Sequence, residues 1–203
     1  MPQPIQTTTE NHCVAFLGNR NIAHGALRDV ALAAKHAFDS NPTEPLLILD
    51  CQTSRFVDLD LIGSVAAVAE RYPAPLSPEA SSRRSDRPRL GVVGKEVTLL
   101  PRHWEWLGAQ PGGASVALRK LVEQARKVNV ETDQARRARD STHLFMTTMA
   151  GDLAGFEEAT RALFSHDQRR FKLEIALWPT DIRLHLEQIS TAGFDSINSD
   201  QIL

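Results

Sequence analysis

The sequence predicts an α+β protein, with short strands near the N-terminus and helices toward the C-terminus. Apolar runs at residues 13–17 and 46–49 have the length and composition of buried strands. From about residue 133 onward the apolar residues recur at helical spacing. The chain has 203 residues, 42% of them hydrophobic and 24% charged, which suits one large or two small globular domains.

The first third of the chain predicts a small α/β domain over residues 13–72. Gly18 to Asn21 separate two apolar runs and give a hairpin signal. Val30, Ala33 and Ala34 fall on one face of a helix, and Ser64 suits a helix N-cap. We therefore expect a ββαββα order, with elements at residues 13–17, 22–24, 29–38, 46–49, 56–59 and 64–72.

The remaining chain divides into a linker, a central module and a helical region. Residues 73–88 contain four prolines and four serines, three of the serines beside two arginines, and almost nothing apolar, which is typical of a linker. The central module follows at residues 89–130, with a short strand expected at residues 90–93. A helical region is expected over residues 131–190, with helices at about 133–149, 156–164, 169–178 and 181–189. We expect residues 1–12 to be a flexible tail and residues 191–203 a frayed one.

Charge is distributed unevenly along the chain, although the net charge is only −2. Residues 83–139 carry 13 basic and 6 acidic side chains, a net charge of +7. Residues 1–82 have a net charge of −4 and residues 140–203 a net charge of −5. A basic centre between acidic flanks indicates a localised anion-binding surface. Pairing of that centre with the acidic ends of the same chain is the alternative.

Several classes of protein are disfavoured by the sequence. No apolar run approaches the roughly 18 residues of a membrane span. Residues 1–11 contain no lysine or arginine, which is unlike a signal peptide. Cys13 and Cys51 follow no metal or redox spacing, so we expect reduced thiols in a cytoplasmic protein.

The central module has the order strand, short helix, glycine turn and second helix over residues 95–127. One strand and two short helices cannot bury their own apolar faces, but two copies can do so by pairing strands and interlocking helices. This order resembles the ribbon-helix-helix module of small DNA-binding dimers. We expect the core of such a homodimer to contain Val97, Leu99, Trp104, Leu107, Leu118, Leu121 and Val122.

The resemblance implies that the paired strands lie in the major groove of DNA, while amides at the start of the second helix bind phosphates. Ser115 suits the N-cap of that second helix. We expect Lys95 and Thr98 to face the major groove and the linker arginines to follow the DNA backbone or a minor groove. The residues assigned to DNA binding are Arg87, Arg89, Lys95, Thr98, Arg102, Gly113, Ala114, Ser115, Arg119 and Lys120.

The strand departs from the pattern of known ribbons, which alternate apolar with basic or amide side chains. Within residues 97–100, Thr98 is the one polar residue. One register gives a reading face of Glu96, Thr98 and Leu100, and the other gives Lys95, Val97 and Leu99. Both faces are poor in hydrogen-bonding groups, so phosphate binding is better supported than base reading, and a purely dimerising role is the alternative.

Three segments, the first of which overlaps the central module, resemble a family of bacterial proteins known as a domain of unknown function. They are residues 87–122 (RPRLGVVGKEVTLLPRHWEWLGAQPGGASVALRKLV), residues 150–164 (AGDLAGFEEATRALF) and residues 178–183 (WPTDIR). The resemblance covers most of the chain beyond Cys13. It implies a bacterial origin and no particular activity.

The leading hypothesis is a homodimeric transcriptional regulator that binds DNA, with no enzyme activity and no cofactor. The second is a protein-interaction dimer resembling an antitoxin or adaptor, with a protein partner bound by the N-terminal or the helical C-terminal region. The third is a metal-dependent enzyme using Asp50, Asp58 and Asp60, although solvated hairpin carboxylates are the simpler interpretation. The sequence shows no catalytic signature and no pair of histidines at metal spacing on one helix face.

Overall fold

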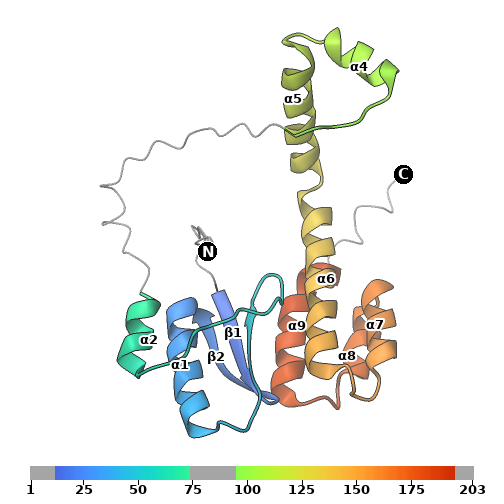
Figure 1. Ribbon diagram of the computed structural model, residues 1–203. Helices are drawn as coiled ribbons and strands as arrows, with labels where there is room; N and C mark the ends of the chain where they lie inside the picture. Colours follow the sequence, from blue (N-terminus) through green and yellow to red (C-terminus); the bar gives the residue numbers. More distant parts are fainter. Residues whose placement is uncertain (1–11, 74–94, 195–203) are drawn as a thin grey trace. The chain divides into compact units, whose positions relative to one another are not determined.

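The computed structural model describes residues 12–73 and 95–194, which form two units (Figure 1). The sheet unit contains residues 12–73 and 132–194, and the central unit contains residues 95–131. The elements of the sheet unit before the central unit are β1 (His12–Leu17), β2 (Arg20–Ala26), α1 (Leu27–Ser40), β3 (Leu46–Asp50) and α2 (Val65–Arg71). Those that follow are α6 (Val130–Ala150), α7 (Phe156–Phe164), α8 (Gln168–Glu174) and α9 (Thr180–Phe194).

The sheet has three antiparallel strands in the order β2-β1-β3. Gly18, with φ +54°, and Asn19 make the turn between β1 and β2, which confirms the predicted hairpin. The fourth predicted strand, at residues 56–59, is wrong. It is reduced to a single antiparallel bridge between Leu49 and Phe56. After Val57 its backbone leaves the edge of β3, so no ladder can continue.

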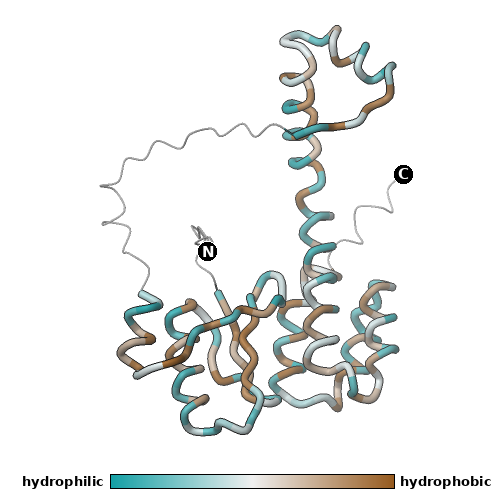
Figure 2. Tube along the Cα trace, in the orientation of Figure 1, coloured by the Kyte–Doolittle hydropathy of each residue, from teal (hydrophilic) through white to brown (hydrophobic). Residues whose placement is uncertain are grey.

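Side chains of β1 point alternately to the two faces of the sheet, and both faces are covered. Cys13 and Ala15 pack with Val30 and Ala34 of α1. Val14 and Phe16 lie on the other face, in a core cluster whose helical members come from α6 to α9. A strand that is buried on both faces reads as a continuous apolar run, which explains the composition of residues 13–17. Figure 2 shows the sheet as a strongly hydrophobic part of the chain.

The helical C-terminal region therefore shares a core with the sheet, although the sequence predicts two separate regions. Two polar contacts join them as well. The hydroxyls of Ser54 and Ser141 are 2.9 Å apart and buried, and the Asn21 N–H donates to Asp181 Oδ2 at 2.9 Å. Since periodicity within one helix cannot reveal which sheet face it will cover, the pattern of the sequence did not predict this packing.

Local signals explain where most helices begin and end. The Ser64 hydroxyl accepts a hydrogen bond from the Ala67 N–H at 3.2 Å, so the predicted N-cap of α2 is confirmed. The predicted helix at 156–164 coincides with α7. The one expected at 169–178 is too long, because α8 ends at Glu174 and the chain then turns before α9.

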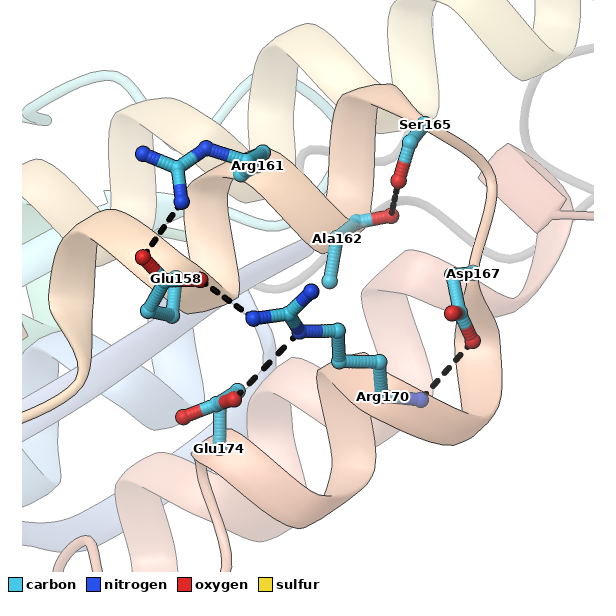
Figure 3. Close-up of polar contacts among 7 residues, drawn as sticks. All are labelled: Glu158, Arg161, Ala162, Ser165, Asp167, Arg170 and Glu174. Carbon is cyan, nitrogen blue, oxygen red and sulfur yellow. Dashed lines mark hydrogen bonds and ion pairs between the residues drawn. The ribbon is translucent and has the colours of Figure 1, made fainter.

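A set of charged side chains joins α7 to α8 (Figure 3). The Glu158 carboxylate pairs with both Arg161 and Arg170, and Arg170 also lies 3.5 Å from Glu174. At the start of α8 the Asp167 carboxylate accepts from the Arg170 N–H at 2.9 Å and caps the helix. This exposed network orients two short helices over the core but contributes little stability by itself.

Candidate nucleic-acid interface

The central unit consists of an extended segment followed by two helices. Residues 95–100 form no regular secondary structure, and then come α4 (Pro101–Gly108) and α5 (Gly113–Val128). Pro101 at the start of α4 suits a helix N-terminus, where the missing N–H costs nothing. The order extended segment, helix, turn and helix is the predicted one, but the strand at residues 95–100 is absent from the single chain. A ribbon strand is formed by pairing, so its presence in two associated copies remains a prediction.

The central unit buries very few of its apolar residues. Among its described residues only Leu107 and Ala117 are buried, at 3% and 7% exposure. Large hydrophobic side chains are exposed instead. They are Val97, Leu100, Trp104, Trp106, Leu121, Val122, Val128 and Val130. Units of this size rarely hold together without a further partner or cross-link, and exposed apolar patches are typical of interaction surfaces.

Part of the predicted dimer core gathers around a pocket between the extended segment, α4 and α5. The pocket has a volume of about 240 Å³ and is lined by Leu99, His103, Trp106, Leu107, Leu118 and Leu121. Four of these belong to the predicted dimer core, while Val97, Trp104 and Val122 of that core are exposed outside the pocket. His103 and Trp106 were not assigned to the core. Their spacing of i and i+3, with Leu107 at i+4, is the helical signal that would have found them.

The turn into α5 depends on two glycines with positive φ. Gly112 has φ +87° and is the N-cap, and Gly113 has φ +72°. The predicted N-cap at Ser115 is therefore wrong, because the left-handed backbone at Gly112 begins the helix three residues earlier. The Gly113 N–H already donates to the Gln110 carbonyl at 2.9 Å. First-turn amides lack intrahelical acceptors, so Ala114 and Ser115 are the better candidates for binding an anion.

Basic side chains lie near this end of α5. The Arg119 Nε–H donates to the Ser115 carbonyl at 3.0 Å, which holds the guanidinium group beside the first turn. Lys120 is exposed next to it, and Arg126 near the far end pairs with Glu123 at 2.9 Å. Ser115 and Arg119 thus lie together at the start of α5.

The other predicted DNA-binding residues lie in the extended segment, in the first turn of α4 or outside the described residues. Lys95, Thr98 and Arg102 are exposed, the first two before α4 and the third in its first turn. Arg87 and Arg89, with the strand expected at residues 90–93, fall outside the described residues. The linker expected at residues 73–88 falls outside them too, apart from Pro73.

Two of the three aspartates of the metal hypothesis have other contacts. Asp50 Oδ1 accepts from the Gln52 and Thr53 backbone amides, at 3.1 and 2.8 Å, and so stabilises the turn after β3. Asp60 pairs with Arg71 at 3.3 Å. Within residues 12–73 and 95–194, no three His, Cys, Asp or Glu side chains group as metal ligands would.

Cys13 is buried in β1, and Cys51, directly after β3, is half-buried. Burial raises the pKa of Cys13 to about 11, with a smaller effect from Asp50. Burial raises the pKa of Cys51 to about 12, with smaller effects from Cys13 and Asp50. Because the thiolate is the nucleophile, these protonated thiols are poorly reactive.

Comparison with known proteins gives one match. The profile of a family described as an uncharacterized protein conserved in bacteria (DUF2239) matches residues 12–190. No curated protein and no solved structure matches the chain. In the part of the chain that the structure describes, no helix combines the length and the apolar character needed to cross a bilayer.

Proposed function

The chain belongs to the DUF2239 family of bacterial proteins, and from the surface of its central unit we propose that it is a homodimeric DNA-binding protein. The regulation of transcription in the bacterial cytoplasm is the role that we propose for it. The observation that carries the proposal is the contrast within residues 95–131, where two apolar residues are buried and eight large ones are exposed.

A second copy of the chain suits this surface. Residues 95–100 have no regular secondary structure, and the backbone of Leu100 is extended, with φ −66° and ψ 150°. We expect this segment to pair with the same segment of another copy. Antiparallel pairing about a two-fold axis would place both sets of α4 and α5 on one side of the ribbon. Val97, Trp104 and Val122 would then cover the pocket residues of the partner, which gives each copy the core that it lacks.

The start of α5 supports binding to phosphate groups. The Ala114 and Ser115 amides lie at the positive end of the helix dipole, and Arg119 and Lys120 add charge beside them. Lys95 and Thr98 would face the groove, and Arg102 would approach the backbone at the start of α4. Residues 83–139 have a net charge of +7, so the sequence concentrates positive charge where the proposal needs it.

Fluorescence anisotropy with a pool of labelled genomic DNA fragments, at several salt concentrations, tests the proposal. We expect saturable binding. The logarithm of the binding constant should fall steeply as the logarithm of the salt concentration rises. Arg119→Ala should weaken binding to all sequences alike and flatten the slope by about one unit. Arg126→Ala is the matched control, because its guanidinium already pairs with Glu123 at 2.9 Å. An unchanged slope for Arg119→Ala would contradict the phosphate role, and absence of binding at low salt would contradict DNA binding altogether.

A dimeric adaptor that binds a protein is the second candidate. It is favoured by the few hydrogen-bonding groups on either face of residues 95–100, where Thr98 is the one polar side chain after Glu96. A stoichiometric protein partner that co-purifies with the dimer, without nucleic acid absorbance, would support this function instead.

A further inference from the structure

The outer edge of β3 is only partly covered. Cys51 N–H donates to the His12 carbonyl and Gly18 N–H to the Pro45 carbonyl. The backbone N–H and C=O groups of the odd-numbered residues in this segment therefore point toward β1. The backbone N–H and C=O groups of the even-numbered residues Leu46, Ile48 and Asp50 point away from β1, toward the outer edge of the sheet.

Two hydrogen bonds close this edge at its C-terminal end. Asp50 N–H donates to the Arg55 carbonyl at 2.9 Å, and Val57 N–H donates to the Ile48 carbonyl at 2.8 Å. A third bond, from the Ser54 N–H to the Asp50 carbonyl at 2.8 Å, closes the turn after β3, and no other backbone hydrogen bond joins β3 to the connection between β3 and α2 in the described chain. The Leu46 amide and carbonyl and the Ile48 amide remain open to an added strand.

A pocket of about 490 Å³ lies at this open edge, which we call the β3 groove. Leu46, Ile48, Val57 and Leu59 line it and also pack against the cluster beneath α1. Phe38 and Phe56 stand at its rim with 49% and 64% of their surface exposed. The connection that forms one wall runs between β3 and α2 (Figure 1).

The charges of the β3 groove are of one sign. Glu44 and Asp58 are its two charged lining residues, and no lysine, arginine or histidine lines it. Glu44 is paired with Arg20 at 3.2 Å. Asp58 has no ion pair within the described residues, so its carboxylate is available to a cation from outside.

We propose that the β3 groove binds an extended peptide segment of a partner protein by strand addition. The backbone of the peptide pairs with Leu46 and Ile48, its apolar side chains at alternate positions contact Phe38 and Phe56, and a lysine or arginine faces Asp58. Such pairing satisfies open backbone groups and buries two exposed aromatic rings at once. The proposal is independent of DNA binding by the central unit, because every residue in it belongs to the sheet unit.

The test uses the full chain and a pool of fluorescein-labelled octapeptides, with Val, Leu, Ile or Phe at alternate positions and lysine or arginine between them. We expect saturable binding by anisotropy and slower hydrogen exchange of the Ile48 amide when the pool is added. Phe56→Ser and Asp58→Lys should each weaken binding about tenfold or more. Phe164→Ser is the matched control, since Phe164 is 48% exposed and lies on α7, outside the groove.

A second pool of the same octapeptides carries methyl groups on alternate backbone nitrogens. It distinguishes strand addition from binding through the apolar and basic side chains alone. Methylation removes the ladder donors but leaves side chains and charge in place, so it should abolish binding. Equal binding of both pools would overturn strand addition. Absence of binding by the first pool, or binding that Phe56→Ser and Phe164→Ser weaken equally, would overturn the β3 groove as the site.

Discussion

His185 should make the stability of the protein fall between pH 7 and pH 4. Its side chain comes from α9, is 5% exposed, and packs between two rings of the core. The ring centroid of Phe145 is 4.5 Å away and that of Phe16 is 5.8 Å away. Burial, with a smaller effect from His24, lowers the pKa of His185 from 6.5 to about 4. The imidazole is therefore neutral in the folded protein at neutral pH.

The sign and size of the effect follow from the difference between the folded and unfolded pKa values. Above pH 6.5 His185 is neutral in both states and adds no pH dependence. Below that pH the unfolded chain binds a proton that the folded protein cannot accept, so the free energy of unfolding falls. The loss is about 2 kcal/mol by pH 5 and approaches about 3 kcal/mol below pH 4. That is a large share of the stability of a typical domain.

Urea unfolding at pH 7 and pH 5, followed by circular dichroism, measures this loss. His185→Leu removes the titrating group and keeps an apolar side chain of similar size in the core. The difference in unfolding free energy between the two pH values should be about 2 kcal/mol smaller for His185→Leu than for the unmodified protein. His36→Gln, at an exposed position on α1, is the control and should leave the difference unchanged. Equal losses for His185→Leu and the unmodified protein would refute the argument.

Three further substitutions test the packing, each by urea unfolding. Phe145→Ala should lower the unfolding free energy by about 3 to 5 kcal/mol, because Phe145 is fully buried at the centre of the core. Gly112→Ala should lower the unfolding free energy of the central unit by about 1 to 2 kcal/mol, because φ is +87° and the new Cβ would lie 3.1 Å from Val116. The loss of the helical circular dichroism signal measures it. Glu158→Gln removes two exposed ion pairs and should cost less than about 1 kcal/mol, and a larger loss would show that the network in Figure 3 does more than orient α7 and α8.

Local patterns in the sequence predicted the elements better than their boundaries or their packing. The hairpin at Gly18, the cap at Ser64 and the helix at residues 156–164 were predicted because each depends on neighbouring residues alone. The prediction of a strand at residues 56–59 was wrong because alternating apolar and polar residues show that one face of a segment is apolar. They do not show that its backbone pairs with a neighbouring strand. Val57, Leu59 and Leu61 do pack inward, but the backbone carrying them leaves β3 after Val57.

Part of the local structure around the candidate site followed from the sequence, whereas its binding to phosphate stays a prediction. The glycine turn and the basic residues at the start of α5 are where the sequence placed them. The N-cap was misplaced because Ser115 is a strong capping residue, whereas Gly112 acts through its backbone conformation, which composition does not reveal. The β3 groove was not predicted at all, because it depends on the point where two segments of backbone separate.

Dimerisation and DNA binding can be separated by substitution if the proposed function is right. Each copy offers one α5 N-terminus, so two copies joined through residues 95–100 offer two phosphate sites held at a fixed distance. Val97→Asp places a charge in the proposed ribbon, where Val97 is 52% exposed in the single chain. It should give monomers in analytical ultracentrifugation and lose DNA binding, because each remaining site binds alone. Arg119→Ala should lose affinity while the protein stays dimeric. If Val97→Asp gave monomers that bind DNA as tightly as before, the phosphate sites would act independently, and the exposed apolar surface would need another explanation.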